Sequence, residues 1–311
     1  MRLTLLSLLL ALPFAACGSG TSEGGPDSGR SRADAGDAGG EEIIGNPDGG
    51  PGAGDTGWVD PCSEEAKLVY VVDSDNTFSS FDPRKLKNGA DPFVDLGELD
   101  CPVFGAAPFS MSVDRSAVAW VLYNNGMLFK VDTRTLHCQA TSYTPDPNLK
   151  LFGMGFVSDA PGVQAETLFI AGGVEPSTTE NSTLAKFQLA PSFEVTTVGA
   201  IPGWPELTGT GDAKLWGFFP DLRPPKVAQI DKTSGDDLRS FPAPSLQGTP
   251  SSWAFAFWGG DFWIFLKRHT ESSTQVHRMK SATGVVDTPL PDTGRRIVGA
   301  GVSTCAPTEI N

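Results

Sequence analysis

Four short runs of alternating residues follow one another from Phe109 to beyond Cys138, and this stretch constrains the fold more than any other. The runs read FSMSV, AVAWVL, MLFKV and TLHCQA, with polar turns between them. Asn125-Gly126 separates the second run from the third, and Asn-Gly between two alternating runs is the strongest short-range signal of a β-hairpin. The stretch therefore predicts four antiparallel strands in chain order.

The same unit recurs along the chain. Its first strand reappears about every 43 to 54 residues, at Phe109, Phe152, Glu206, Trp253 and Ile297. Repeats of this length are typical of β-propeller blades. The first strands are rich in small residues, among them Gly153, Gly209 and Gly299, which suits inner strands that crowd around a central axis. The second strands carry large rings that can fill the gaps between neighbouring sheets, namely Tyr70, Trp120, Trp216 and Trp263.

The count of strands is uneven at the two ends. The repeats begin with a second strand at Lys67 and end with a first strand at Ile297, so these two strands would complete one blade together. The sequence therefore predicts an all-β fold, a five-bladed propeller of four-stranded blades whose ends close the ring and remove exposed sheet edges. A six-bladed ring or a double sheet remains the alternative. No stretch has the apolar spacing of a long helix.

Four cysteines lie in the repeat region, and an even number in an exported protein is typical of disulfides. Three pairings are possible, and the five-blade arrangement selects one. Cys62 precedes the first N-terminal strand and Cys305 follows the last C-terminal strand, so we expect Cys62–Cys305 to lock the ring. Cys101 would then pair with Cys138.

Residues 1–17 have the layout of a signal peptide, with Arg2 followed by an apolar run too short to span a membrane. Ending on Phe14-Ala15-Ala16-Cys17, the segment resembles a bacterial lipoprotein signal. The resemblance implies cleavage before Cys17 and attachment of diacylglycerol and palmitate to that residue. Gly18 follows the cysteine, which by the same resemblance favours the outer membrane or cell surface over the inner membrane.

Residues 18–58 consist mainly of Gly, Ser, Asp, Ala and Pro, a composition that cannot bury a core and predicts a disordered tether. The propeller domain would then occupy residues 59–311. The chain has a formal net charge of −14. This charge argues against nucleic acid and against anionic lipid as partners, so contact with the membrane would come only through the lipid anchor. We expect a monomer.

Side chains for catalysis or metal binding are few. The chain has three histidines, His137, His269 and His277, and their spacing matches no metal site. Aspartates recur at one place in each repeat, as expected of tight turns. The inner strands offer mainly Glu206 as a carboxylate, whereas glycoside cleavage needs two. The sequence therefore predicts no catalytic residues, no metal and no cofactor.

The repeat near the C-terminus is conspicuously aromatic, with Trp253, Phe257 and Trp263 among its rings. Packing between blades explains these rings, because side chains of alternating parity face the two neighbouring sheets. An aromatic platform for a sugar or an apolar side chain is the alternative.

The phrases ELTGTGDAKLWGFFP and GAGVSTCAP resemble those of uncharacterised myxobacterial-type lipoproteins with a propeller domain. That resemblance covers about residues 60–307 and implies a fold but no activity. We expect a non-enzymatic binding or scaffolding module for an envelope protein or glycan, the alternative being an envelope hydrolase or lyase acting on polysaccharide or peptide. The site would lie on the face formed by the loops from strand two to three and from blade to blade. The candidate residues there are Asp75, Tyr123, Asn124, Asp221, Arg223, Arg268 and His269.

Overall fold

The computed structural model describes residues 62–176 and 181–309. The chain divides into two units, residues 1–57 and 58–311, and every described residue belongs to the second. The predicted signal peptide, the predicted lipidation site Cys17 and the predicted tether over residues 18–58 lie outside the described residues. In the part that the structure describes, no helix is long and apolar enough to cross a membrane.

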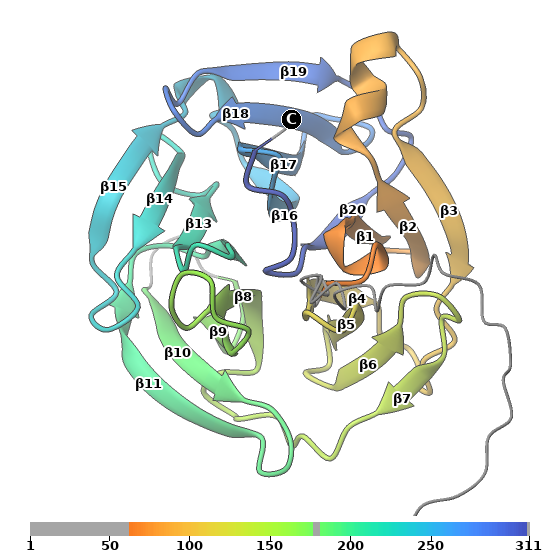
Figure 1. Ribbon diagram of the computed structural model, residues 1–311, viewed down its shortest axis with the longest axis vertical. Helices are drawn as coiled ribbons and strands as arrows, with labels where there is room; N and C mark the ends of the chain where they lie inside the picture. Colours follow the sequence, from red (N-terminus) through yellow and green to blue (C-terminus); the bar gives the residue numbers. More distant parts are fainter. Residues whose placement is uncertain (1–61, 177–180, 310–311) are drawn as a thin grey trace, which may run out of the picture. The chain divides into compact units, whose positions relative to one another are not determined.

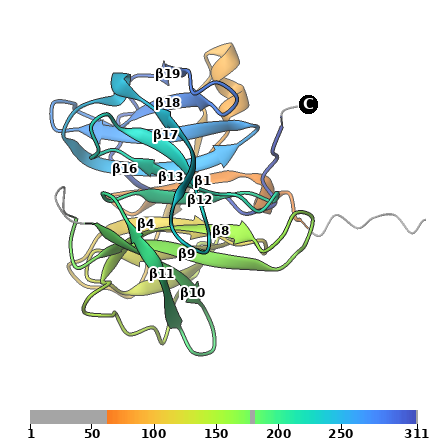
Figure 2. The ribbon, with the colours of Figure 1, turned by 90° about the vertical axis from the view of Figure 1, so that its left-hand side faces the viewer.

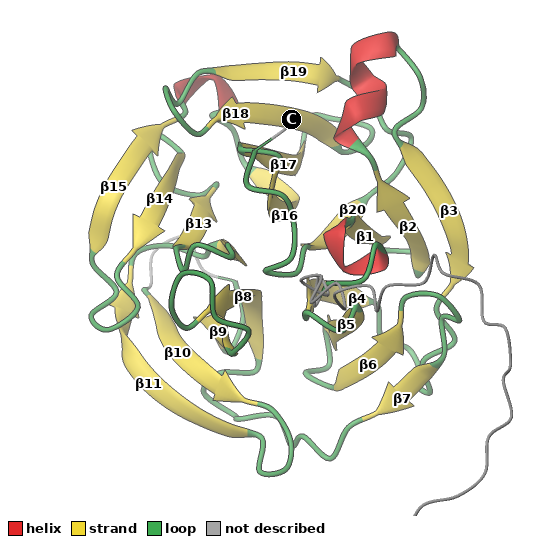
Figure 3. Ribbon diagram, viewed as in Figure 1, coloured by secondary structure: helices red, strands yellow, loops and turns green. Residues whose placement is uncertain are grey.

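The second unit is a ring of five antiparallel sheets, each with four strands (Figures 1 and 3). Blade one contains β20 (Ile297–Gly301), β1 (Val69–Asp73), β2 (Thr77–Phe81) and β3 (Phe93–Glu98). Blade two contains β4 (Pro108–Val113), β5 (Val118–Tyr123), β6 (Leu128–Asp132) and β7 (Cys138–Ala140). Blade three contains β8 (Leu151–Ser158), β9 (Glu166–Gly173), β10 (Ser182–Gln188) and β11 (Glu194–Ile201). The predicted five-bladed β-propeller is thereby confirmed, and six blades are excluded.

The remaining two blades repeat the pattern. Blade four contains β12 (Glu206–Gly209), β13 (Leu215–Phe219), β14 (Lys226–Ile230) and β15 (Asp237–Pro242). Blade five contains β16 (Pro250–Trp258), β17 (Asp261–Arg268), β18 (Gln275–Lys280) and β19 (Val286–Leu290). The described helices are three short 3₁₀ segments, η1 (Glu65–Lys67), η2 (Pro83–Asn88) and η3 (Pro244–Leu246).

The inner strands β8, β12 and β20 contain glycine because inner-strand backbones approach one another closely. A Cβ atom on Gly155 of β8 would lie 2.9 Å from the backbone of Leu207 in β12, and one on Gly209 would lie 2.1 Å from the carbonyl oxygen of Phe156. These distances are shorter than a carbon atom tolerates. Small residues are therefore a condition for packing five inner strands around one axis, as the sequence predicts.

The two ends of the repeat region complete blade one together. Antiparallel pairing of β1 with β20 places Val71 opposite Ala300. Just beyond these strands, a disulfide joins Cys62 to Cys305, and a second joins Cys101 to Cys138. Both pairs are those that the blade count predicts. Two disulfides are typical of proteins that fold outside the cytoplasm.

Side chains between blades form the core. The cluster between blades five and one contains Val71, Phe81 and Trp263, and the ring centroids of Phe81 and Trp263 lie 5.5 Å apart. Each of the other described clusters likewise combines residues from different blades. Most of the aromatic residues of blade five, including Phe257, Phe262 and Trp263, are buried in this way, so packing accounts for them.

The ring has two faces because successive strands run in opposite directions. The mouth face, as we call it, carries the turns from strand two to three and the connections from blade to blade, among them residues 74–76, 124–127 and 291–296. The closing face carries the turns from strand one to two and from three to four, together with residues 302–309. In Figure 2 the C-terminal end of the chain extends from the closing face, on the right of the view.

Candidate functional site

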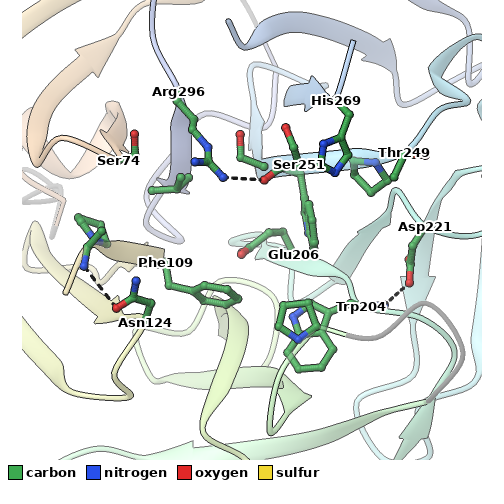
Figure 4. A pocket seen from close by; sticks show the side chains of 17 residues that line it. Ser74, Phe109, Asn124, Trp204, Glu206, Asp221, Thr249, Ser251, His269 and Arg296 are labelled. Atoms are coloured by element: carbon green, nitrogen blue, oxygen red, sulfur yellow. Dashed lines mark hydrogen bonds between the residues drawn. The ribbon is translucent and has the colours of Figure 1, made fainter. Parts of the chain in front are cut away.

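A cavity of about 460 Å³ opens at the axis on the mouth face (Figure 4). All five blades contribute to it, through the first residues of the inner strands and the turns beside them. Its lining residues are Ser74, Ala107, Pro108, Phe109, Asn124, Pro176, Trp204, Glu206, Asp221, Thr249, Pro250, Ser251, Ser252, Trp253, His269, Arg296 and Val298. Cavities of about 300–1,000 Å³ with an apolar wall and a few convergent polar groups are typical of small-molecule sites.

Three aromatic side chains form the apolar part of the lining. Phe109 lies on β4, Trp204 lies just before β12, and Trp253 lies on β16. Trp204 is only 5% exposed, and both Phe109 and Trp253 pack against its hydrophobic cluster. The three rings are therefore held in place by packing, and Phe109 and Trp253 keep part of their surface open to the cavity.

Glu206 lies near the centre of the cavity lining in Figure 4. Its side chain is buried, and the Ser110 hydroxyl of blade two donates a hydrogen bond of 3.1 Å to its Oε2 atom. Burial raises the pKa of the Glu206 carboxyl well above its usual value, although hydrogen bonds from Ser110 and the Met154 backbone lower it. A Cβ atom on Gly153 would lie 3.0 Å from Oε2, so the glycine leaves room for this carboxyl.

Asp221 and Trp204 form a second polar group of the lining. The backbone N–H of Trp204 donates a hydrogen bond of 3.0 Å to Asp221 Oδ2. Burial raises the pKa of the Asp221 carboxyl. Among the described residues, neither Asp221 Oδ1 nor Trp204 Nε1 has a hydrogen-bond partner, although both atoms are buried. Gly203 permits the arrangement, because it has a φ of +68° and a Cβ there would lie 2.7 Å from Asp221 Oδ1.

The rim of the cavity carries the side chains that solvent reaches. The Arg296 guanidinium donates a hydrogen bond of 3.0 Å to the carbonyl oxygen of Ser251, and the His269 backbone N–H donates one of 3.0 Å to the carbonyl oxygen of Thr249. Deeper in the lining, the Ser252 hydroxyl is buried and has no partner in the part of the chain that the structure describes.

Three of the seven predicted binding residues line the cavity in the structure, and four do not. Asn124, Asp221 and His269 line the cavity. Asp75 and Arg223 are exposed and do not line it.

Tyr123 and Arg268, the other two predicted binding residues, do not line the cavity, and each has a partner in the fold. Tyr123 is fully buried at the end of β5, where its hydroxyl donates a hydrogen bond of 2.9 Å to Asn76 Oδ1 and burial raises its pKa to about 12. Arg268 is ion-paired with Glu271, to which its Nε donates a hydrogen bond of 2.7 Å. Both side chains are therefore held in place by the fold.

Several lining residues were not predicted from the sequence as parts of a site. Trp204 and Arg296 lie in connections between blades, and Ser252 lies at the start of an inner strand. Their position before or at the start of the first strand of a repeat is the signal that could have found them, because residues at such positions of β4, β12, β16 and β20 line the cavity. Within the described ranges, no group of three or more His, Cys, Asp or Glu side chains could hold a metal ion.

The closing face has a different polar cluster at the same axis. Glu166 at the start of β9 accepts hydrogen bonds of 2.8 Å from the Arg115 backbone N–H and from the Thr304 hydroxyl. The Arg115 guanidinium donates to Thr304 Oγ1 at 2.8 Å and to Cys62 Sγ at 3.4 Å. Burial raises the pKa of the Glu166 carboxyl to about 7. This cluster connects the ring-closing disulfide with blades two and three.

No protein-family model and no curated protein matches this chain. Solved structures resemble it weakly. A protein of unknown function from Bacteroides caccae has a TM-score of 0.42 and 11% identity, over 75% of this chain and 97% of that one. A chain of a mitotic checkpoint complex has a TM-score of 0.38 and 13% identity, over 71% of this chain and 60% of that one. TolB from Acinetobacter baumannii has a TM-score of 0.41 and 13% identity, over 72% of this chain and 52% of that one.

Proposed function

We propose that this protein is an exported, lipid-anchored binding module of the cell envelope, which holds an envelope protein or glycan through the mouth face of its propeller. The observation that carries the proposal is the 460 Å³ cavity, to which all five blades contribute and which brings aromatic rings and polar groups together at one end of the axis. Three of the residues expected to bind from the sequence, Asn124, Asp221 and His269, line it.

The location in the envelope is supported by two features of the chain. Two disulfides close loops in the propeller, which suits an oxidising compartment. The sequence ending on Cys17 resembles a lipoprotein signal, and two or more acyl chains give a stable membrane anchor. Replacing Cys17 with Ser should move the protein from the membrane fraction to the soluble fraction. A variant that stays in the membrane fraction would contradict the anchor.

The binding role is tested by matched variants on the two faces. The double variant His269→Ala/Arg296→Ala changes exposed side chains at the cavity rim, and His137→Ala/Arg134→Ala changes the same residue types in the turn between β6 and β7 on the closing face. Tagged full-length protein is used to recover partners from detergent-solubilised envelope, and each recovered band is quantified. We expect the first variant to lose the bands that the wild type and the second variant retain. Equal recovery by all three would overturn the assignment to the mouth face.

A hydrolase or lyase acting on polysaccharide or peptide is the second candidate, and one observation favours it. The cavity lining contains two carboxyl groups, Glu206 and Asp221, with raised pKa values. A pair of carboxyl groups, one of them able to act as an acid, is what glycoside cleavage needs. The test is release of reducing ends from envelope polysaccharide by the wild type but not by Glu206→Gln or Asp221→Asn. Absence of products from polysaccharide and peptide substrates would remove this candidate.

A further inference from the structure

The charged groups at the cavity point to a ligand without net charge. Glu206 accepts its hydrogen bonds from a hydroxyl and a backbone N–H, and no basic side chain contributes to its environment. A carboxyl that is buried without a cationic partner keeps its proton. Asp221 likewise has a raised pKa and is bonded to a backbone N–H. Arg296, at the rim, already donates to the Ser251 carbonyl. Among the described residues, the interior therefore presents no cluster of cations for an anion, and neither buried carboxyl has a cationic partner.

The lining instead combines aromatic rings with hydrogen-bond donors and acceptors. Phe109, Trp204 and Trp253 supply flat apolar surfaces. Trp204 Nε1 can only donate, Asp221 Oδ1 can accept, and the Ser252 hydroxyl can do both. All three of these atoms are buried and have no partner among the described residues, which is costly unless a bound molecule or water meets them. A ligand that fits must carry donors and acceptors next to an apolar face.

We propose that the cavity of the mouth face binds a neutral saccharide unit, either as a free sugar or as the end of a glycan chain. A sugar ring presents C–H groups on one face, which pack on aromatic rings, and hydroxyls around its edge, each of which both donates and accepts. The inference rests on the proposed binding function and specifies its ligand. The cavity volume of about 460 Å³ lies in the range of small-molecule sites.

The experiment measures saccharide binding to the full-length protein by calorimetry, in a detergent whose head group is not a sugar. The neutral probes are maltotetraose and chitotetraose, and the charged probes of similar length are tetragalacturonate and a chitosan tetramer. We expect at least one neutral probe to bind about tenfold more tightly than both charged probes. The corresponding monosaccharide is measured as well. If the natural ligand is the end of a glycan chain, the tetramer should bind more tightly than the monosaccharide. If it is a free sugar, the two should bind equally.

Two variants locate the binding. Trp253→Ala removes a ring of the lining and should weaken binding about tenfold, as expected of an aromatic anchor. Because that ring also packs in the core, Ser252→Ala serves as the second variant. The Ser252 hydroxyl has no partner in the described chain, so its loss should leave the melting temperature unchanged or higher while weakening binding about fivefold. His137→Ala on the closing face is the control that should bind as the wild type does.

Failure of every neutral probe to bind would overturn the inference, as would tighter binding of a charged probe or a Ser252→Ala variant with unchanged affinity. These outcomes differ from failure of the binding role itself. If no saccharide binds but His269→Ala/Arg296→Ala still abolishes recovery of envelope partners, the mouth face binds something other than a neutral sugar.

Discussion

At the closing face, Glu166 is bonded to Arg115 and Thr304, and the Cys62–Cys305 disulfide lies beside them. At the mouth face, Ser252 and Trp204 carry buried polar atoms that no described residue meets. Both clusters lie near the same axis, but at opposite ends of the ring. The difference indicates that one end of the ring holds the fold together, whereas the other leaves hydrogen-bonding groups for a ligand.

This contrast predicts that variants at the two faces separate stability from binding. Substitutions at the closing face should change the free energy of unfolding without changing recovery of partners. Substitutions at the rim of the mouth face should reduce recovery of partners without changing the free energy of unfolding.

Loss of the ring-closing disulfide should have the largest effect on stability. The double variant Cys62→Ser/Cys305→Ser opens a loop with a sequence separation of 243 residues, for which chain entropy predicts a loss of roughly 5 kcal/mol. The double variant Cys101→Ser/Cys138→Ser opens a loop with a sequence separation of 37 residues and should lower the free energy of unfolding by about 4 kcal/mol. Urea unfolding without reductant measures both. A smaller loss for the first variant than for the second would contradict the role of the closing face.

Glu206→Ala should cost about 3 kcal/mol, because it leaves the Ser110 hydroxyl and the Met154 backbone N–H without their acceptor in a buried place. Glu206→Gln keeps the volume and an acceptor oxygen, and should cost about 1 kcal/mol at neutral pH. Thermal unfolding of the two variants provides the measurement. Equal losses would show that the acceptor oxygen at this position does not stabilise the fold.

Glu166 should make stability depend on pH. Its pKa is about 7 in the folded protein, whereas the unfolded chain loses the proton near the ordinary value of 4.5. Unfolding therefore releases a proton between these values, and the free energy of unfolding falls as the pH rises from about 4.5 through about 7. We expect this contribution to reach about 3 kcal/mol. It is fully present below pH 4.5.

The variant Glu166→Gln removes the titrating group and isolates this contribution. It should be more stable than the wild type above pH 7 and about equally stable near pH 4, as measured by urea unfolding across that range. A difference in stability that stays constant with pH would contradict the shift of the Glu166 pKa.

Tyr123→Phe should have the smallest effect. It removes the hydrogen bond to Asn76 and should lower stability by about 1 kcal/mol, without changing recovery of envelope partners. Asn124→Ala, one residue further along at the exposed rim, should leave stability within about 0.5 kcal/mol and reduce recovery. Loss of partners from the Tyr123 variant would place that hydroxyl in the binding site.

The propeller could be predicted because its determinants are local and repeated. Alternating runs indicate strands, Asn125-Gly126 indicates a hairpin, and glycines in the first strands indicate inner strands. The repeats begin with a second strand at Lys67 and end with a first strand at Ile297, which indicates that the two ends close the ring together. The sequence could predict only which face of the propeller carries the site. It could not predict which side chains line the cavity, because that depends on the direction in which each side chain points. Tyr123 packs against Phe129 with ring centroids 5.1 Å apart, although the polar turn begins one residue later.

Arg268 and Trp204 illustrate two further limits of the sequence. The partner of Arg268 is Glu271, three residues further along, and the pair could have been suspected from that spacing. Trp204 lies in an irregular connection with no periodicity, so only the folded ring shows that it meets Asp221. Side chains contributed by connections are thus the part of the site that pattern analysis misses.

Photo-crosslinking in the producing cells tests the central claim most directly. A photoreactive amino acid is placed singly at Asn124 or His269 on the mouth face, and at Arg134 or His137 on the closing face, all four positions being exposed. The difference between the faces predicts light-dependent adducts from the first two positions and none from the second two. Adducts from Arg134 or His137, with none from Asn124 or His269, would show that the propeller binds through the other end.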